Sequence, residues 1–493
     1  MPDTGHNMPA SRELVTGRQS VALGTRYATD GTRRPATSSD SPTESTSEGT
    51  RRKIMKRWIT GFAIVLMLLA VGAPAIAQES DTAKDDEIVQ QKKEQTKEQG
   101  NRLGLGFAYG EQKAMQVWTD TGRLILKTDD GEFAWWVDAR VMLDAAVFAE
   151  DKNQLHNGVE LRRGRFALKA LLWSDWAAEL DIDVAEAELD VKDAYVGYAG
   201  WDNALVKIGQ HREPFSLEET TTSRYISFME RAYVIDALAP GRHIGVSYAK
   251  WGEHYRFMGG IYGQEIGDDD DPEEYEGDSD AIGITGRFVW VPILNKEEAR
   301  TLHLGISATT RTTDAGTDKV RFRSRAETHI AHNRFVNTGK MKDVDDYQML
   351  GLDAVVQLGS WSFQGEYITA HLNRFNDRED VDVDGWYTYV SWFPTGENRN
   401  YTMAQSRFVS PNAKNAIELL ARFSTIDLND LDAGVEGGQA DNITFGLNWY
   451  FNNNVRWMIN YTMVDNDQYA DGDGDYIGDD DFSFLGTRLQ ILF

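Results

Sequence analysis

The stretch Trp135-Trp136-Val137-Asp138-Ala139-Arg140-Val141-Met142-Leu143-Asp144-Ala145-Ala146-Val147 alternates between apolar and polar side chains. Its odd-numbered positions are all apolar, whereas the even-numbered positions from Asp138 to Asp144 are mostly polar. Since successive side chains of a β-strand point to opposite faces, the pattern predicts a strand with one apolar and one polar face. The same alternation recurs in residues 417–424, 445–451, 455–463 and 485–493.

The composition agrees with a protein made of strands. The chain of 493 residues has 11% aromatic residues and 44 glycines but only 11 prolines, which suits many short strands better than helices. It contains no cysteine, which excludes disulfides, thiolate metal sites and a cysteine nucleophile. The net charge of −27 argues against a nucleic-acid partner, because phosphate backbones need a basic surface.

Two features favour a membrane barrel over a soluble sandwich. The strands are long, with aromatic residues near the ends of the apolar face, as in the aromatic girdles of outer-membrane barrels. The connections also alternate in length: residues 452–454 form a tight turn, whereas residues 264–280 and 464–481 form long acidic loops. Residues 122–493, at roughly 23 residues per strand with its loop, predict an all-β, antiparallel transmembrane β-barrel of about sixteen strands.

The residues before the predicted barrel divide into three segments. Residues 1–54 are rich in Ser, Thr, Gly and Arg and predict a disordered extension or an upstream mis-start, with translation beginning at Met55. A genuine extension is the alternative. Residues 55–77 combine a basic start, a short apolar run and an Ala-x-Ala site, which predicts a secretory signal peptide. Residues 78–121 are polar and predict a flexible periplasmic lead.

The chain ends on an alternating strand whose last residue is Phe493. A terminal aromatic residue on such a strand resembles the signal that outer-membrane barrels present to the barrel assembly machinery. We therefore expect that machinery as a partner and the bacterial outer membrane as the location.

Three stretches resemble the phosphate-selective porin O and P family, over about residues 120–493. They are Gly209–Gly245, which contains the run from His211 to Glu219, then Ser391–Glu397, and Ala416–Tyr461. The resemblance implies a sixteen-stranded outer-membrane porin, a homotrimer, and passive, anion-favouring diffusion of small solutes. Small anions, with phosphate among them, and outer-membrane lipid are then the expected partners, and no cofactor is expected.

Residues 215–242 carry too many charges to face lipid, including Glu218, Glu219, Glu230 and Asp236. We expect a loop folded into the lumen, where water solvates these charges. The resemblance implies the same: it makes this segment the constriction loop and places Arg224 at the narrowest point. Arg231 lies in the same loop, and a guanidinium fork suits phosphate or carboxylate.

Strand parity predicts further cations in the lumen. Arg163, Arg165 and Lys169 share the polar face of one strand. Lys207 lies on the polar face of a later strand that ends near Gln210, and Arg212 follows that strand as a further candidate. A ring of such cations would concentrate anions in the pore. Five other arginines also lie on the polar face of their strands: Arg140, Arg287, Arg422, Arg456 and Arg488. For each of these cations the alternative role is an ion pair that braces the barrel wall. We expect that bracing role for Arg456 and Arg488.

The sequence does not identify the solute that the porin carries. The constriction loop contains no lysine, and the acidic residues concentrate in outer loops, where they could hold divalent cations that bridge lipopolysaccharide. A general diffusion porin is therefore the alternative to phosphate selectivity. A barrel enzyme would need Ser and His on the lipid-facing parity of neighbouring strands, and His303 has the polar parity.

Neither catalytic residues nor a metal site are predicted. His329 and His332 lack a third ligand at a fixed spacing. Residues 471–475 resemble part of a calcium loop, but the glycine and glutamate that complete such a loop are missing.

Overall fold

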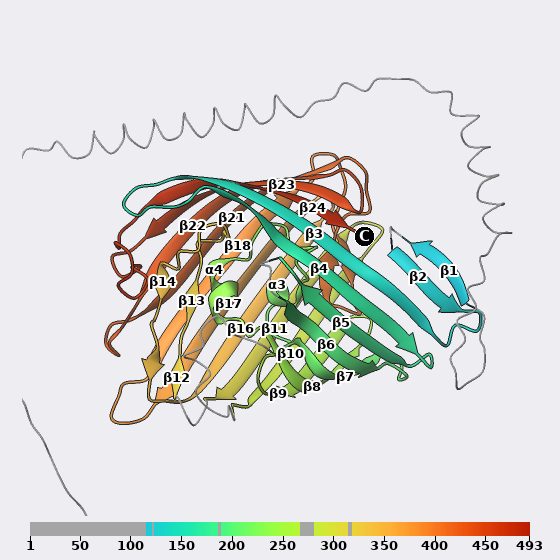
Figure 1. The fold of residues 1–493 in the computed structure, drawn as a ribbon, viewed down its shortest axis with the longest axis horizontal. Helices are drawn as coiled ribbons and strands as arrows, with labels where there is room; N and C mark the ends of the chain where they lie inside the picture. The colour runs from blue at the N-terminus through green and yellow to red at the C-terminus, as the bar shows by residue number, and fades with distance from the viewer. Residues whose placement is uncertain (1–114, 121–122, 186–188, 267–280, 314–317) are drawn as a thin grey trace, which may run out of the picture. The chain divides into compact units, whose positions relative to one another are not determined.

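The computed structural model describes residues 115–120, 123–185, 189–266, 281–313 and 318–493 (Figure 1). Its main sheet is antiparallel and has eighteen strands, of which sixteen form a closed barrel, because the last strand, β24, pairs with the first barrel strand, β3. The expected number of strands is therefore confirmed. The segments predicted as an extension and a signal peptide, residues 1–54 and 55–77, lie outside the described residues.

The barrel strands follow one another around the wall in chain order. They are β3 (Ala134–Ala149), β4 (Gly158–Leu172), β5 (Trp176–Asp183), β6 (Asp190–Tyr198), β7 (Ala204–Arg212), β8 (Arg242–Trp251), β9 (Tyr255–Tyr262), β10 (Gly283–Asn295), β11 (Arg300–Thr312), β16 (Val344–Leu358), β17 (Trp361–Arg374), β18 (Val381–Trp392), β21 (Ala416–Asp430), β22 (Val435–Tyr450), β23 (Val455–Asn466) and β24 (Phe482–Leu492).

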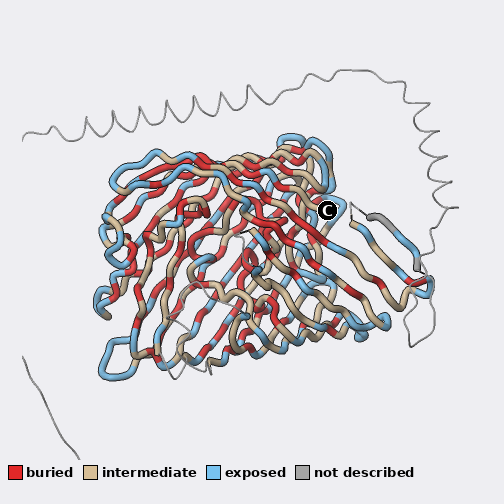
Figure 2. Tube along the Cα trace, viewed as in Figure 1, coloured by how far each residue is buried: buried red, intermediate tan, exposed pale blue. Residues whose placement is uncertain are grey.

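Burial alternates along these strands as the sequence predicts (Figure 2). On β3, Asp138, Arg140 and Asp144 are buried in the lumen, whereas Val137 and Leu143 are more than 40% exposed on the outside. An outer surface of exposed aliphatic and aromatic side chains is what a barrel presents to lipid. No helix in the described part of the chain is long and apolar enough to cross a membrane.

The two ends of the barrel differ in their connections. Short turns such as residues 451–454, between β22 and β23, lie at the end that carries the C-terminus (Figure 1). Since outer-membrane barrels have short turns on the periplasmic side and long loops outside, this end is periplasmic. The external loop 313–343 is long and contains two small strand pairs: β12 (Lys319–Val320) with β15 (Met341–Lys342), and β13 (Arg323–Ser324) with β14 (Val336–Asn337).

One periplasmic connection is long, and the sequence pattern did not predict its shape. Residues 393–415, here called the periplasmic hairpin, join β18 to β21 and contain β19 (Asn400–Thr402) paired with β20 (Arg407–Val409). Tyr401 and Phe408 of this hairpin are buried with Val289 and Val355 of the barrel wall. The hairpin therefore folds into the lumen from the periplasmic end.

The structure differs from the expected start of the barrel at residue 122. The last residues of the segment predicted as a flexible lead form β1 (Met115–Asp120), which pairs with β2 (Arg123–Thr128). Strand β2 then pairs with the first residues of β3, at Ala134–Trp136, below the point where Phe493 pairs with Ala139. The barrel proper begins at Ala134, because β1 and β2 extend only one end of β3.

The connection between β7 and β8, residues 213–241, contains all but the last residue of the predicted constriction loop 215–242 and is called by that name below. It lies inside the barrel and contains two short helices, α3 (Leu217–Thr220) and α4 (Tyr233–Leu238). Its apolar side chains pack against one side of the lumen, where Phe228 and Tyr233 join Tyr387 and Ile426 of the wall in a single cluster. Side chains of the external loop 313–343, such as Phe335, belong to the same cluster. Apolar packing thus fills the side of the lumen along β16–β22 and leaves open space beside β3–β9.

Candidate functional site

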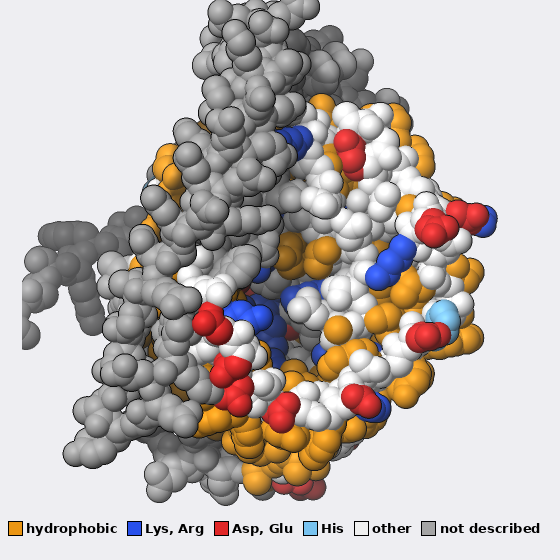
Figure 3. Space-filling view, turned by 90° about the vertical axis from the view of Figure 1, so that its right-hand side faces the viewer, with side chains coloured by type: hydrophobic (Ala, Val, Ile, Leu, Met, Phe, Trp, Pro, Cys, Tyr) orange, Lys and Arg blue, Asp and Glu red, His pale blue; other side chains and the backbone are white. Residues whose placement is uncertain are grey.

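A cavity of about 560 Å³ occupies the open side of the lumen. It is enclosed by β3–β9, the constriction loop and the periplasmic hairpin, and Arg123 of β2 reaches its edge. Seen from the periplasmic end, the barrel is hollowed and shows Lys and Arg side chains inside (Figure 3). Nine cations line the cavity: Arg123, Arg140, Lys169, Lys207, Arg212, Arg224, Arg242, Arg256 and Arg407. Five carboxylates accompany them: Asp138, Glu179, Asp181, Asp193 and Glu213.

Several of these cations are paired with the carboxylates of nearby strands. Arg140 lies 3.0 Å from Asp181, and Arg242 lies 3.1 Å from Asp193. Lys169 lies 3.0 Å from Glu179. The Lys169–Glu179 pair joins the adjacent strands β4 and β5, and the other two pairs each reach across one intervening strand. All three brace the lumen wall, and their charges largely cancel.

Glu179, Asp181 and Asp193 lie close enough together to be considered as metal ligands, and no other such group occurs in the described residues. Each of the three is engaged by a lumen cation, namely Lys169, Arg140 and Arg242 respectively. Carboxylates that already neutralise cations are poor ligands for a further cation. The cluster is therefore part of the bracing network.

Three cavity cations have no carboxylate partner among the described residues but lie over aromatic rings. The Lys207 ammonium lies 4.0 Å from the ring centre of Tyr195. The guanidinium of Arg256 lies 5.8 Å from the ring of Trp251, and that of Arg407 lies 5.8 Å from the ring of Tyr225. A cation–π contact positions a cation without neutralising it. These three cations are therefore free of a close ion pair with any described residue, although Asp193 and Glu179 lie near enough to Lys207 to attract its charge.

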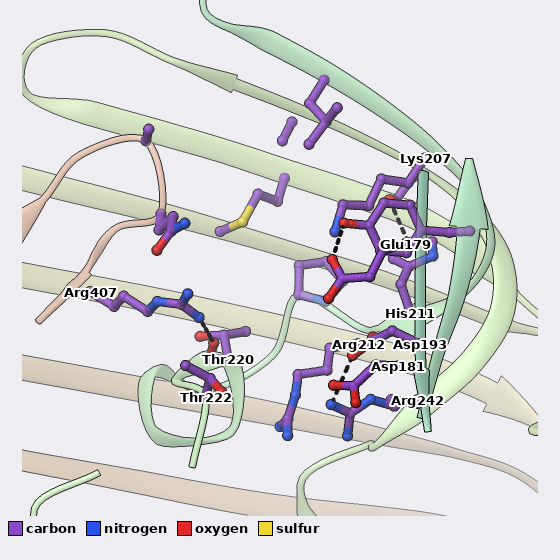
Figure 4. A pocket seen from close by; sticks show the side chains of 18 of the residues that line it. Glu179, Asp181, Asp193, Lys207, His211, Arg212, Thr220, Thr222, Arg242 and Arg407 are labelled. Carbon is purple, nitrogen blue, oxygen red and sulfur yellow. Dashed lines mark hydrogen bonds and ion pairs between the residues drawn. The ribbon is translucent and has the colours of Figure 1, made fainter. Parts of the chain in front are cut away.

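The unneutralised cations come from different walls of the cavity. Lys207 belongs to β7 and lies beside His211, whereas Arg407 reaches in from the periplasmic hairpin and donates to the Thr220 carbonyl at 2.8 Å (Figure 4). Burial, together with the nearby charge of Arg224, lowers the pKa of Arg407 to about 10. Arg407 is therefore still charged at neutral pH.

The constriction loop is held in place by buried carboxylates. Glu230 of the loop lies 2.9 Å from Arg162 and 2.5 Å from Arg488, and Arg488 lies 2.6 Å from Asp144. Burial opposes ionisation of Glu230, but the charges of Arg162, Arg163 and Arg488 outweigh it and hold the Glu230 pKa well below its usual range. This network fastens the loop to β3, β4 and β24.

A second anchor fixes the start of the loop. The Glu366 carboxylate on β17 accepts hydrogen bonds from the Ser216 hydroxyl at 2.6 Å and from the backbone N–H groups of Leu217 and Glu218 at 2.9 and 2.7 Å. Ser216 has a positive φ of 61°, a conformation that is rare outside glycine and that surrounding contacts must maintain. The loop therefore has one defined position across the pore.

A row of arginines lies on the external side. Arg321, Arg323 and Arg325 alternate with the buried Phe322, Ser324 and Ala326 along one extended segment of the loop 313–343. Because Phe322 and Ala326 belong to the apolar cluster, the half-buried arginines point away from it. They add three basic residues to the external loop.

The predicted site residues separate into two groups. Lys169, Lys207, Arg212 and Arg224 line the cavity. Of these, only Lys207 lacks a carboxylate partner, since Arg224 lies 2.7 Å from Asp138 and Arg212 is paired with Glu219.

The other three candidates lie away from the cavity in ion pairs. Arg163 is 3.6 Å from Glu230, Arg165 is 2.7 Å from Asp183, and Arg231 is 3.1 Å from Glu219. Their surroundings favour bracing, and their place in the anion path remains a prediction. Arg488 braces the wall, as expected.

Sequence reasoning missed five cations that matter here, one of which is Arg242, the first residue of β8. Arg256 has the polar parity of its strand, between the exposed Tyr255 and Phe257, so alternation could have identified it. Arg162 faces inward because a bulge shifts the register opposite Met142 and Leu143. Arg407 and Arg123 lie in short strands that are not part of the barrel wall. In such strands the alternating pattern cannot predict which side chains face the lumen.

Comparisons with known proteins agree with this architecture. The family model "Phosphate-selective porin O and P" matches residues 136–493. Porin O of Pseudomonas aeruginosa is 24% identical over 423 residues, covering 76% of this chain and 91% of that protein. An uncharacterized protein of Caulobacter vibrioides is 28% identical over 385 residues, covering 74% of this chain and 75% of that protein.

Among solved structures, an anion-selective porin from Comamonas acidovorans superimposes with a TM-score of 0.50 at 13% identity, covering 73% of this chain and all of the other. That likeness concerns the fold. The family model, in contrast, matches nearly the whole barrel, including the constriction loop and the periplasmic hairpin. The chain is therefore an outer-membrane porin and belongs to the phosphate-selective porin O and P family.

Proposed function

We propose that this porin lets small solutes diffuse passively and favours anions because of the charge of its lumen cavity. The observation that carries the proposal is that the charge of the cavity is opposite to that of the whole chain. The chain has a net charge of −27, yet the cavity has a formal excess of four positive charges. Fixed charges in a narrow passage raise the local concentration of the opposite ion.

The arrangement of the cations supports this proposal. Lys207, Arg256 and Arg407 make no ion pair in the described part of the chain and rest on aromatic rings. The arginine row of the loop 313–343 lies above them on the external side. An anion that enters from outside would thus meet basic groups before and after the constriction loop.

Phosphate is one candidate solute, since the family model and the similarity to Porin O point toward it. The structure also supports a broader preference for anions, because Arg224 and Arg212 are engaged by carboxylates. A general diffusion porin is the alternative, and it would show little charge preference.

The proposal includes assembly and surroundings expected of such a porin. We infer a homotrimer in the outer membrane, in contact with lipid and lipopolysaccharide and inserted by the barrel assembly machinery. We also infer a channel rather than an enzyme. In support, the fully buried His303 bonds to Asp353 and to the Tyr401 hydroxyl, which anchors the periplasmic hairpin.

The test is the zero-current potential of the purified protein in a planar bilayer under a KCl gradient. Anion preference would give the sign of the chloride equilibrium potential, and Arg256→Gln should move the potential toward zero. Arg300→Gln is the matched control, because Arg300, the first residue of β11 at the periplasmic edge, has a side chain that is 60% exposed and pairs with the equally exposed Glu298. A potential near zero would support the general porin, and a cation-favouring potential would refute the proposal.

A further inference from the structure

The lumen cavity is larger than a compact inorganic anion requires. Its volume of about 560 Å³ lies in the range of sites that hold small organic molecules. Its lining also contains carboxylates and hydroxyl groups, but one part of it, here called the apolar wall, consists of apolar and aromatic side chains that include Tyr195, Leu205, Ala249 and Met258. An apolar wall offers nothing to bare phosphate but can bury the body of an organic solute.

The unneutralised cations are spread around this apolar wall. Lys207 on β7 and Arg407 on the periplasmic hairpin lie on opposite sides of the cavity (Figure 4). Arg256 on β9 is near enough to both for like charges to repel. A compact anion can neutralise only one wall at a time, whereas an elongated dianion can neutralise two walls together.

Two of these cations also have donors that nothing satisfies. The Nε–H groups of Arg256 and Arg407 are buried and have no hydrogen-bond partner among the described residues. Buried donors are normally paired with an acceptor. A guanidinium that is positioned by an aromatic ring, with an unused donor, is suited to an oxygen acceptor of a ligand.

We infer that the cavity is a binding subsite for organic dianions in which an apolar or aromatic spacer separates two anionic oxygen groups. This inference rests on the proposed function, since it names the class of anion that the pore selects. One anionic group lies against Arg407 and the other against Lys207, with Arg256 between them. The spacer lies along Tyr195, Leu205 and Met258.

The experiment measures how three solutes block the chloride current of the purified protein in a planar bilayer at pH 8. The solutes are benzene-1,4-dicarboxylate, inorganic phosphate and benzoate, compared at equal ionic strength. We expect the half-blocking concentration of the dicarboxylate to be at least tenfold lower than that of phosphate or benzoate, because only the dicarboxylate reaches both walls.

Two variants test the assignment of residues, and a third is the control. Arg407→Gln and Lys207→Met should each raise the half-blocking concentration of the dicarboxylate at least tenfold, toward that of benzoate. Arg300→Gln, at the exposed periplasmic start of β11, should leave it unchanged. Arg407 lies on the hairpin, whereas Lys207 lies in the wall, so the two variants do not depend on the same local fold.

The possible outcomes distinguish a failure of the dianion subsite from a failure of the proposed anion-favouring function. An anion-favouring pore that phosphate and the dicarboxylate block equally would overturn the dianion subsite and leave the proposed function in place. Dicarboxylate block that survives both substitutions would overturn the subsite as well. A cation-favouring pore would overturn the proposed function itself.

Discussion

Arg224 of the constriction loop and Asp138 of β3 form a buried ion pair with 2.7 Å between Nη2 and Oδ1. The pair changes how a mutation at Arg224 should act. Arg224→Ala removes one cation and leaves the Asp138 carboxylate with only the more distant Lys169, at 3.5 Å, as a described ion-pair partner, so anion preference should fall. The zero-current potential under a KCl gradient measures this effect, and the barrel should stay folded because the site borders the open cavity.

The partner supplies the control for this prediction. Asp138→Asn removes this carboxylate, so the double variant Arg224→Ala, Asp138→Asn should recover the anion preference of the original protein. Asp138→Asn alone should increase it. If the double variant behaves like Arg224→Ala, then Arg224 acts directly on the solute rather than through the charge of Asp138.

Arg488 should contribute strongly to stability, because it is completely buried and bonds to both Asp144 and Glu230. Arg488→Met leaves the buried Asp144 and the half-buried Glu230 without this partner, and breaking a buried pair costs about 3–5 kcal/mol. Denaturant unfolding in detergent should show a loss of that order. Arg300→Met, at the exposed start of β11, should change the free energy of unfolding by no more than a few tenths of a kcal/mol, and an equally small loss at Arg488 would contradict its bracing role.

The pH dependence of the loop anchorage follows from Glu230. Its pKa is lower in the folded protein than in the unfolded chain, where it is about 4.3, so its contribution to stability is complete above that value. The contribution is lost only as the pH falls through the lower, folded pKa. We therefore expect Glu230→Gln to destabilise the protein at pH 7 and nearly as much at pH 5, measured by thermal unfolding.

Glu218 provides the opposite case in the same loop. Burial raises its pKa above the ordinary value, so the folded state loses stability as the pH rises from the unfolded pKa toward the folded one. Glu218→Gln should therefore raise the unfolding temperature at pH 7 relative to the original protein and change it less at pH 4. A larger gain at pH 4 than at pH 7 would show that this sign is wrong.

The strands and their inner and outer faces could be predicted because alternation is a local property. The alternating pattern alone places Val137 on the outer face of the wall and Asp138 on the inner face. The charge state of the pore could not be predicted in this way, since it depends on partners that are distant in sequence. Arg224 is neutralised by Asp138, 86 residues away, whereas Lys207 has no such partner, and their local sequences do not distinguish the two.

Other features escaped because they break the pattern itself. The bulge opposite Met142 and Leu143 turns Arg162 inward. The residue types at that position do not predict a bulge. The periplasmic hairpin contains two strands of only three residues each, and such strands are too short to show an alternating pattern. The arginines at 321, 323 and 325 did offer a signal, since alternating basic residues stand out in an acidic chain.

Tyr401 should hold the periplasmic hairpin in the lumen through His303. Its hydroxyl lies 2.7 Å from Nδ1 of the fully buried His303. Tyr401→Phe leaves that nitrogen without a partner, at a cost of about 1–3 kcal/mol, and loosens the hairpin that carries Arg407. We expect a lower unfolding temperature and larger fluctuations of the open-channel current. Tyr255→Phe, on the exposed outer wall, is the control, and a quiet channel in Tyr401→Phe would mean that apolar packing alone fixes the hairpin.

Phe493 should act in assembly rather than in permeation. Its backbone N–H and carbonyl both bond to Ala139 of β3, so they close the barrel seam, whereas its side chain is 45% exposed. Phe493→Ala keeps the backbone bonds and removes only the exposed ring. We expect less folded protein in the outer membrane, measured by heat-modifiable mobility of membrane fractions, while the channels that do assemble keep the conductance and anion preference of the original protein.

Leu431→Ala tests whether any exposed apolar side chain has this effect, because Leu431 is 52% exposed in the turn between β21 and β22. A normal yield of Phe493→Ala, or an equal loss in Leu431→Ala, would exclude a specific assembly signal in the terminal ring.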